Sequence, residues 1–379
     1  MRQPLSRTVR FGILGTTRSS PCGVANFSAA LSEALSAHGS QVGVVRVADE
    51  SPTPDDDGVI GELVSGSAES VAACAATLNN SDVAVIHFDH HVYGGVDGDE
   101  VLGVVEALRV PLIVVVHDVL KDPTPHQHWV LDTIIAKSDR VVVMSESARQ
   151  RLCGAHTVDQ RKVVTIPHGA TIPTGARPKR ASRPTLLTWG LLRPGKGIER
   201  VIDAMVSLRT VAGRPRYLVV GRTHPDVEAA DGEAYRDALI ERAKNAGVAD
   251  CVSIDARHYD TAMLTSVIQS ASLIVLPYDS KDQVTSGVLV DAIASGRPVV
   301  ATAFPHAVEL LSGGAGTFVD HDDPDALALA LRQVLTQPRL SGSMAAKARE
   351  MGPELEWSSV AATYIDLAQR ILAERRVSR

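Results

Sequence analysis

The sequence contains few aromatic residues and few cysteines. Phe, Trp and Tyr together make up 4% of its 379 residues, so its hydrophobic cores have to be built mostly from Ala, Val and Leu. The four cysteines, Cys22, Cys74, Cys153 and Cys251, are far apart and form no Cys-x-x-Cys motif. This spacing argues against a zinc site and against a disulfide framework, and it is typical of a reducing compartment.

The sequence also lacks a long hydrophobic run. No apolar segment approaches the ~20 residues that are needed to span a membrane. The apolar residues 11–15 near the N-terminus are too short for a signal peptide. We therefore predict a soluble, cytoplasmic protein without a transmembrane segment, and peripheral contact with a membrane stays open.

A strong charge of either sign is missing as well. The formal net charge of −6 is mild and gives no sign of a nucleic-acid-binding surface. Any phosphate must therefore be bound by a local pocket. Hydrophobic residues make up 45% of the chain, which is enough for full-sized cores, and the length indicates two or three domains.

Short apolar segments alternate with helical patterns along the whole chain, which predicts parallel sheets covered by helices on both faces. The fold class is therefore α/β, with two Rossmann-like, doubly wound parallel-sheet domains facing a central cleft. Ligands of such sheets bind beyond the carboxyl ends of the strands. The predicted strands are residues 9–14, 42–47, 82–87, 112–117, 141–144, 163–166, 186–189, 217–220, 252–254, 273–276, 299–301 and 317–319.

A polar segment rich in Pro and Gly divides the two halves. We predict an N-terminal domain at residues 1–170, a linker at 171–184 and a C-terminal domain at 185–352. The last segment, residues 353–379, opens on Pro353, and a last amphipathic helix is predicted after this proline. Its apolar stripe consists of Trp357, Val360, Tyr364, Leu367 and Ile371.

The most informative segment is residues 283–302. Thr285, Ser286 and Gly287 end a loop and open a helix, with Gln283 just before it and Asp291 about one turn inside it. A helix start presents unpaired N–H groups and the positive end of a dipole, so it can bind a phosphate. Gln283 and Asp291 could then hold the neutral parts of the same ligand, including a hydroxyl pair. An ordinary strand–loop–helix connection explains the segment equally well.

A second loop, residues 190–197, follows the first strand of the second half. Gly190 opens it, and it carries Arg193 and Lys196 before a predicted helix. Two cations that face the helix start at Ser286 would clamp a diphosphate, since Arg binds it in a bidentate way and Lys acts as a point charge. The alternative is a solvated basic turn, and the Gly-rich setting favours the functional interpretation.

Two more candidates follow strands of the first half. The loop that ends at Gly23 lacks Gly-x-Gly-x-x-Gly spacing, which excludes a nicotinamide-type fingerprint, but it allows close backbone approach to an anion or a sugar. A plain turn explains it nearly as well. His117 and Asp118 end another strand, where they are placed for a cleft, although a helix cap with a passive histidine is an equal alternative.

Clustered His and Asp residues raise the question of a metal. His87, His90 and His91 follow one strand, but no fourth ligand or metal motif is evident, so a loop that lines the cleft is the favoured interpretation. The acidic residues 55–57 and 320–323 fit solvated loops and helix caps better than a metal site.

Taken together, these motifs resemble the retaining glycosyltransferases of family 4 (glycosyl transferases group 1), which have the GT-B fold. The resemblance covers nearly the whole chain, and residues 283–302 are its most specific part. The last helix, with Trp357, resembles the C-terminal helix that crosses back onto the first domain in this fold. The other segments that carry the resemblance are residues 21–27, 114–118, 141–146, 166–169, 190–199 and 219–221.

The resemblance implies a nucleotide-sugar donor on the second domain and an acceptor on the first. Arg193 and Lys196, in the loop opened by Gly190, would then hold the donor diphosphate. The backbone of Ser286 and Gly287, after Thr285, would cradle the distal phosphate.

Three further roles come with the resemblance. Asp291 stands where the family has a glutamate that binds the ribose hydroxyls, and His117 stands where a histidine approaches the transferred sugar. Gly23 falls in a loop near the phosphate and the acceptor. The family has two glutamates separated by seven residues, whereas this chain has Gln283 and Asp291 at these positions. Gln283 can still form a hydrogen bond with a sugar hydroxyl, but it lacks the negative charge of glutamate.

The resemblance predicts transfer of a hexosyl unit from a UDP- or GDP-linked sugar to an acceptor hydroxyl, with retention of the anomeric configuration and with neither metal nor other cofactor. The acceptor would be a carbohydrate, a lipid-linked molecule or a small molecule. Two alternatives stay open. One is a nucleotide-sugar 2-epimerase of the same fold, which the histidines at 87–91 keep open. The other is a non-catalytic nucleotide-sugar-binding subunit, since the first acidic residue of the pair is missing.

Overall fold

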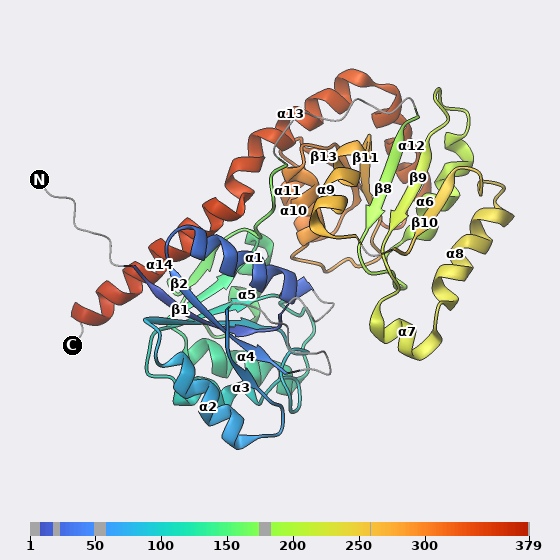
Figure 1. Cartoon of the computed structure of the whole chain (residues 1–379). Coiled ribbons are helices and arrows are strands. Elements are labelled where there is room, and N and C mark those ends of the chain that lie inside the picture. The colour runs from blue at the N-terminus through green and yellow to red at the C-terminus, as the bar shows by residue number, and fades with distance from the viewer. Residues whose placement is uncertain (1–7, 18–22, 49–57, 174–182, 258, 378–379) are drawn as a thin grey trace, which may run out of the picture. The chain divides into compact units, whose positions relative to one another are not determined.

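A computed structural model of the chain describes residues 8–17, 23–48, 58–173, 183–257 and 259–377. The chain forms two compact units, which are shown in Figure 1. Unit 1 comprises Met1–Gly169 and Trp357–Arg379, and unit 2 comprises Ala170–Glu356. Most of the predicted linker, residues 174–182, lies outside the described residues.

Unit 1 is built on a parallel sheet with the strand order β3-β2-β1-β4-β5-β6-β7. The central strands are buried along their whole length, as their mostly apolar and often β-branched residues require. The strands are β1 (Arg10–Gly15), β2 (Gln41–Val47), β3 (Val59–Leu63), β4 (Val83–Phe88), β5 (Leu112–Val116), β6 (Arg140–Val143) and β7 (Val163–Thr165).

The last helix of the chain belongs to the core of unit 1. The predicted apolar stripe is confirmed, because Val360, Tyr364, Leu367 and Ile371 are buried in one hydrophobic cluster, against which Trp357 packs. This cluster also contains the apolar face of the first helix, which Figure 1 shows in blue beside the red last helix. The helices of unit 1 are α1 (Gly23–Ala37), α2 (Ala68–Leu78), α3 (Val101–Ala107), α4 (Pro125–Lys137), α5 (Glu146–Ala155) and α14 (Trp357–Val377).

Unit 2 repeats the design with the strand order β10-β9-β8-β11-β12-β13, again in parallel. Its strands are β8 (Thr185–Trp189), β9 (Arg216–Val220), β10 (Val252–Asp255), β11 (Leu273–Leu276), β12 (Val299–Thr302) and β13 (Gly316–Val319). Its helices are α6 (Ile198–Leu208), α7 (Pro225–Asp231), α8 (Ala234–Asn245), α9 (Thr261–Ser270), α10 (Gly287–Ala294), α11 (Pro305–Leu311), α12 (Pro324–Thr336) and α13 (Pro338–Leu355).

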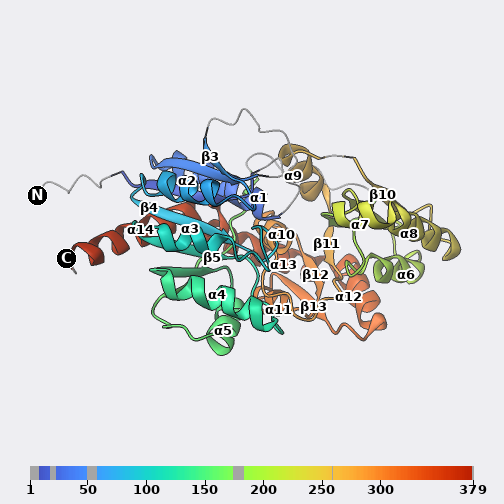
Figure 2. The same cartoon turned by 90° about the horizontal axis from the view of Figure 1, so that it is seen from below.

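Alternate residues of the unit 2 strands supply two separate cores. In β11, Leu273 and Val275 join a cluster with α6, α8 and α12, whereas Ile274 and Leu276 join a cluster with α9, α10 and α11. Both faces of the sheet are therefore covered by helices, as the sequence predicts (Figure 2).

The strand orders place a topological switch point in each unit. In unit 2, β8 lies between β9 and β11, so the loops that leave β8 and β11 diverge at the carboxyl edge of the sheet. In unit 1, the same holds for β1 and β4. Such a switch point is where open parallel sheets bind their ligands. Each predicted strand is present with small shifts at its ends.

Three elements were not predicted. Strand β3 at the sheet edge was missed because it alternates between exposed and buried residues and contains Gly61 and Glu62, so it lacks the apolar run of a central strand. Helix α7 was missed because its described residues bury no side chain, and hydrophobic periodicity is the main sequence signal of a helix. The third element is α13, which opens on Pro338.

The last helix begins after Pro353, as predicted, but later than the predicted segment, which opens at residue 353. Pro353 lies inside the last turn of α13, where proline removes one backbone donor without ending the helix at once. The chain leaves the helical conformation at Glu356, whose ψ is 137°, and α14 begins at Trp357. Among the described residues, no helix has both the length and the low polarity that crossing a bilayer requires.

Candidate active site

The loop at residues 190–197 connects β8 to α6 and is held against the segment that follows β11. The backbone N–H of Asp279 donates to the carbonyl oxygen of Gly195 at 2.9 Å. Gly197, the N-cap of α6, has a φ of 66°, and a Cβ at this position would collide with the carbonyl oxygen of Pro277. Only glycine allows this approach without strain. The two loops that leave the switch point of unit 2 are thus packed together.

Lys196 lies over an aromatic ring in this loop pair. Its Nζ is 4.5 Å from the centroid of the Tyr278 ring, a cation–π distance. Burial lowers the pKa of Lys196 to about 8, and the nearby positive charge of Arg193 contributes to the decrease. In the part of the chain that the structure describes, neither Arg193 nor Lys196 forms an ion pair with a carboxylate. The two neighbouring positive charges are therefore available to an anionic ligand.

The helix start predicted at Gly287 is present and lies close to these cations. Ser286 is the N-cap of α10, and its hydroxyl oxygen accepts from the N–H of Leu289 at 3.3 Å. Burial raises the pKa of Tyr278, and the Ser286 side chain and the charge of Arg193 partly offset that increase. Tyr278 therefore connects the cationic loop to the start of α10.

One detail of the predicted phosphate cradle needs correction. The backbone N–H of Ser286 donates to Nδ1 of His306 at 2.8 Å, so it is already used within the protein. Of the described residues at this helix start, Gly287 and Val288 have N–H groups without a partner in the chain. Sequence reasoning missed His306 because it lies 20 positions away, at the start of α11.

Gln283 and Thr285 form the turn before α10. The side-chain amide of Gln283 donates to the carbonyl oxygen of Thr285 at 2.9 Å, and the backbone of Gln283 accepts from the N–H of His306 at 3.3 Å. These bonds fix the main chain of the turn and leave the side-chain carbonyl of Gln283 as an acceptor.

Asp291 lies one turn inside α10 with its side chain partly buried. No described residue forms a hydrogen bond or ion pair with its carboxylate. Burial raises its pKa to about 7. An unpaired carboxyl group with this property destabilises the fold, which is typical of a group that is retained for a ligand.

In unit 1, His117 belongs to a cluster of three histidines around the buried ring of Phe27. Nε2 of His117 lies 3.0 Å from Nδ1 of His87. The ring of Phe27 meets the rings of His87, His117 and His168 edge-on, with centroid distances of 5.4, 5.0 and 5.1 Å, and it meets Trp357 at 5.1 Å.

Burial keeps these three histidines neutral. It lowers the pKa of His87 to about 3 and that of His168 to about 4, and it lowers the pKa of His117 well below its ordinary value. His117 is only partly buried, so a neutral imidazole, held by His87, is accessible at the end of β5. Sequence reasoning identified His117 but not its partners His87 and His168.

The histidines at positions 87, 90 and 91 do not converge on one point. His87 faces His117, whereas Nδ1 of His90 lies 3.2 Å from the carbonyl oxygen of Asp97. The side chain of His91 is 86% exposed and contacts Asp89. Among the acidic runs, Asp323 caps α12 as predicted, and residues 55–57 lie outside the described residues.

Gly23 is the first residue of α1, and the rest of its loop, residues 18–22, lies outside the described residues. A Cβ at Gly23 would meet no described atom within 4 Å, so packing does not demand a glycine there. Gly190, by contrast, has a φ of 115°, and a Cβ there would lie 4.0 Å from Nζ of Lys196. Cys74, Cys153 and Cys251 are free thiols.

Solved structures with the same architecture identify the fold. Anabaena HepE in complex with UDP and glucose superimposes with a TM-score of 0.74 at 17% identity, over 96% of this chain and 100% of that one. Sucrose-phosphate synthase from Thermosynechococcus elongatus gives a TM-score of 0.75 at 18% identity, over 97% and 100%. At such identities the likeness shows the fold alone, and that fold is the GT-B fold of glycosyltransferases.

The family follows from the sequence. The model of glycosyltransferase family 4 matches residues 21–172, and the model of glycosyl transferases group 1 matches residues 175–351. The two matches together cover most of the chain, and the protein belongs to the family 4 glycosyltransferases.

Curated relatives agree with this family. A D-inositol 3-phosphate glycosyltransferase of Kineococcus radiotolerans is 26% identical over 270 residues, which are 65% of this chain and 60% of that protein. The protein of the same name from Rhodococcus opacus is 28% identical over 242 residues, which are 60% of this chain and 52% of that protein. The matches thus span between 52% and 60% of the length of these two relatives.

Proposed function

We propose that this glycosyltransferase moves a hexosyl unit from a nucleoside-diphosphate sugar to an acceptor hydroxyl, with retention of the anomeric configuration and without a metal in the reaction. The observation that carries the proposal is the pair of cations, Arg193 and Lys196, which have no carboxylate partner among the described residues and lie next to the start of α10.

The barrier to this reaction is charge separation between an oxocarbenium-like sugar and a departing diphosphate. Arg193, Lys196 and the N–H groups at the start of α10 would stabilise the developing negative charge, the task that a divalent cation performs in other transferases. Because these groups are held in place by the loop contacts at Gly195 and Gly197, they would need little reorganisation during the reaction.

Other residues would orient the donor. Asp291 would accept hydrogen bonds from the ribose hydroxyls, and Gln283 would bind a hydroxyl of the sugar through its side-chain carbonyl. His117, neutral and held by His87, would donate to or accept from the transferred sugar without adding charge. No side chain in this set is an evident nucleophile. The leaving phosphate itself would take the proton of the acceptor, as the same-face mechanism implied by the resemblance requires.

Similar proteins suggest substrates for testing. The structure of HepE contains UDP and glucose, and the curated relatives are named for D-inositol 3-phosphate. We therefore propose UDP-linked hexoses as first donors, with GDP- and ADP-linked sugars as comparisons, and hydroxyl-rich acceptors that include inositol phosphates.

The histidines at positions 87 to 91 keep the 2-epimerase alternative open. Their side chains contact different partners and do not form one group, so we favour transfer.

The test of the proposed function has two stages. A ligand that binds only the folded protein increases its free energy of unfolding, by about 2.7 kcal/mol when the ligand concentration is a hundred times its Kd. The melting temperature of the protein rises accordingly. UDP, GDP and ADP are therefore compared by thermal shift. Sugars linked to the nucleotide that stabilises the protein most are then tested as donors with a panel of acceptors. These assays contain EDTA and are run well below the melting temperature. We expect one nucleotide to stabilise the protein, and NMR to show a glycosidic product with the anomeric configuration of the donor.

Four results would contradict the proposal. Inverted product rejects retention, and activity that is lost in EDTA and restored by magnesium rejects the metal-free mechanism. Nucleotide binding without turnover of any donor supports a non-catalytic subunit, whereas a C2-epimerised sugar nucleotide formed without acceptor supports an epimerase.

A further inference from the structure

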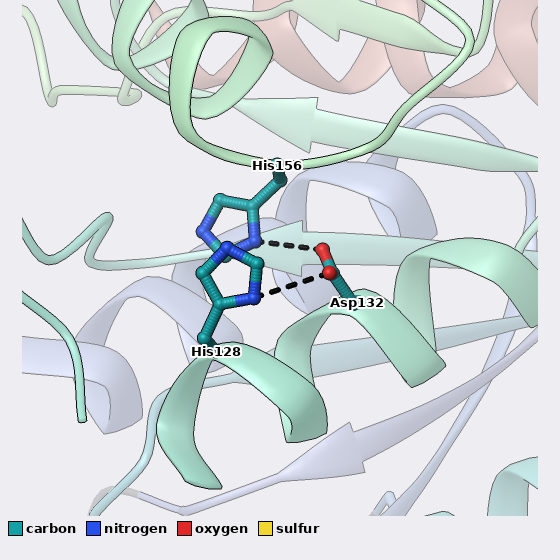
Figure 3. Close-up of side chains that lie close together, drawn as sticks. All are labelled: His128, Asp132 and His156. Atoms are coloured by element: carbon teal, nitrogen blue, oxygen red, sulfur yellow. Dashed lines mark hydrogen bonds and ion pairs between the residues drawn. The ribbon is translucent and has the colours of Figure 1, made fainter. Parts of the chain in front are cut away.

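Two histidines and one aspartate of unit 1 converge at a place that the proposed transfer does not use. His128 and Asp132 lie one turn apart on α4, and His156 is the C-cap residue that directly follows α5. Nδ1 of His128 is 3.1 Å from one carboxylate oxygen of Asp132, and Nδ1 of His156 is 2.8 Å from the other. Figure 3 shows both rings with a nitrogen directed at the carboxylate.

The three side chains lie close enough together to share a metal ion. One potential ligand atom of each residue lies within 4.8 Å of those of the other two. The two imidazole rings are stacked, with centroids 4.4 Å apart and planes inclined by 20°. The side chain of His156 is only 2% exposed, whereas those of His128 and Asp132 are 38% and 30% exposed. One ligand is therefore deeply buried, and the other two leave a path to solvent.

The second nitrogen of His128 supplies an independent observation. Nε2 of His128 lies 3.0 Å from the carbonyl oxygen of Ala155, which can only accept a hydrogen bond, so this nitrogen carries a hydrogen. Nδ1 of the same ring lies 3.1 Å from Asp132, so it is the ring nitrogen that a metal ion between these side chains would bind. Histidines that bind metals typically donate their other N–H to a backbone carbonyl in this way.

We propose that His128, Asp132 and His156 form a binding site for a divalent transition-metal ion of the zinc class. Two imidazoles and one carboxylate suit Zn²⁺ and Co²⁺, whereas Mg²⁺ and Ca²⁺ prefer oxygen ligands throughout. Three protein ligands leave a fourth position for water. The ion fastens the end of α5 to α4, so its role is to stabilise unit 1, and the site shares no residue with the set that acts on the sugar nucleotide.

The experiment uses the full chain without an affinity tag, freed of metal by dialysis against a chelator. Co²⁺ is titrated while its visible ligand-field absorption is recorded, and Zn²⁺ is then added as a competitor. We expect the protein to bind one equivalent of Co²⁺ and to show the absorption spectrum of four-coordinate Co²⁺. Added Zn²⁺ should displace the Co²⁺ and abolish this spectrum. Zn²⁺ at about a hundred times its Kd should raise the melting temperature by about 5–10 °C.

Variants assign the site. His128→Ala and His156→Ala should each weaken Co²⁺ binding by at least about 10- to 100-fold, since even the loss of an outer-shell partner has an effect of that size. His91→Ala removes an exposed histidine of the same unit and should bind as the unmodified chain does. His128 is partly exposed, so its variant keeps the test valid if His156→Ala does not fold.

Two outcomes overturn the proposal. One is the absence of saturable Co²⁺ binding below millimolar concentration, which would mean that Asp132 only joins the two histidines by hydrogen bonds. The other is equal Co²⁺ affinity in His128→Ala, His91→Ala and the unmodified chain, which would place the ion elsewhere.

Discussion

Replacing Lys196 with alanine is expected to weaken the binding of the nucleoside diphosphate about 10- to 150-fold. This range corresponds to the ~1.5–3 kcal/mol of a hydrogen bond to a charged group. Lys196 has no carboxylate partner among the described residues, and its charge is half buried over Tyr278, so a bound diphosphate gains most of that interaction. The rate of transfer should fall further, because the negative charge on the diphosphate increases in the transition state.

Calorimetry with the preferred nucleotide and steady-state kinetics measure these two effects. Lys244→Ala is the matched control, because Lys244 is an exposed lysine of the same unit that pairs with Glu241 at the end of α8. If Lys196→Ala binds and transfers as the control does, Lys196 has no part in the site.

Replacing Asp291 with asparagine is expected to stabilise the free protein at pH 8 while it weakens nucleotide binding. Burial raises the pKa of Asp291 to about 7 from an ordinary value of 3.8. Between these values the folded state keeps a proton that the unfolded state has lost, so the stability of the protein falls as the pH rises. Asparagine cannot ionise and avoids this loss. The gain in stability should therefore be largest above pH 7 and should shrink as the pH falls toward 4.

Melting temperatures from pH 4 to pH 8 test the stability effect, and calorimetry at pH 8 tests the loss of nucleotide affinity, which we expect to be about tenfold or more. Asp366→Asn, at an exposed position within α14, is the control and should show neither effect. A variant that loses stability at pH 8, or that binds the nucleotide unchanged, would show that Asp291 is a structural residue.

The sequence predicts the fold well where strands are central and helices amphipathic. β4 and β5 are recognisable because burial on both faces requires continuous apolar runs. β3 is not, because an edge strand that is half exposed resembles a loop. The position of α14 could be predicted from its stripe, but its start could not, because Pro353 fits into the last turn of the preceding helix.

The site could be predicted where one segment carries several of its residues, as the loop with Arg193 and Lys196 and the start of α10 do. Contacts between distant segments could not. The N–H of Ser286 is bound by His306, and His117 is held by His87 from the neighbouring strand. In the same way, the spacing of His128 and Asp132 is visible on one helix, but the approach of His156 depends on how α5 packs.

The central claim is that Arg193 and Lys196 bind the diphosphate of the donor. The most direct measurement is calorimetry of the preferred nucleoside diphosphate and its monophosphate, with the unmodified chain and with the Arg193→Ala, Lys196→Ala double variant. We predict that removal of the terminal phosphate weakens binding at least about tenfold in the unmodified chain and far less in the variant, because charges in contact are energetically coupled. An equal loss in both proteins would show that the two cations do not contact the diphosphate.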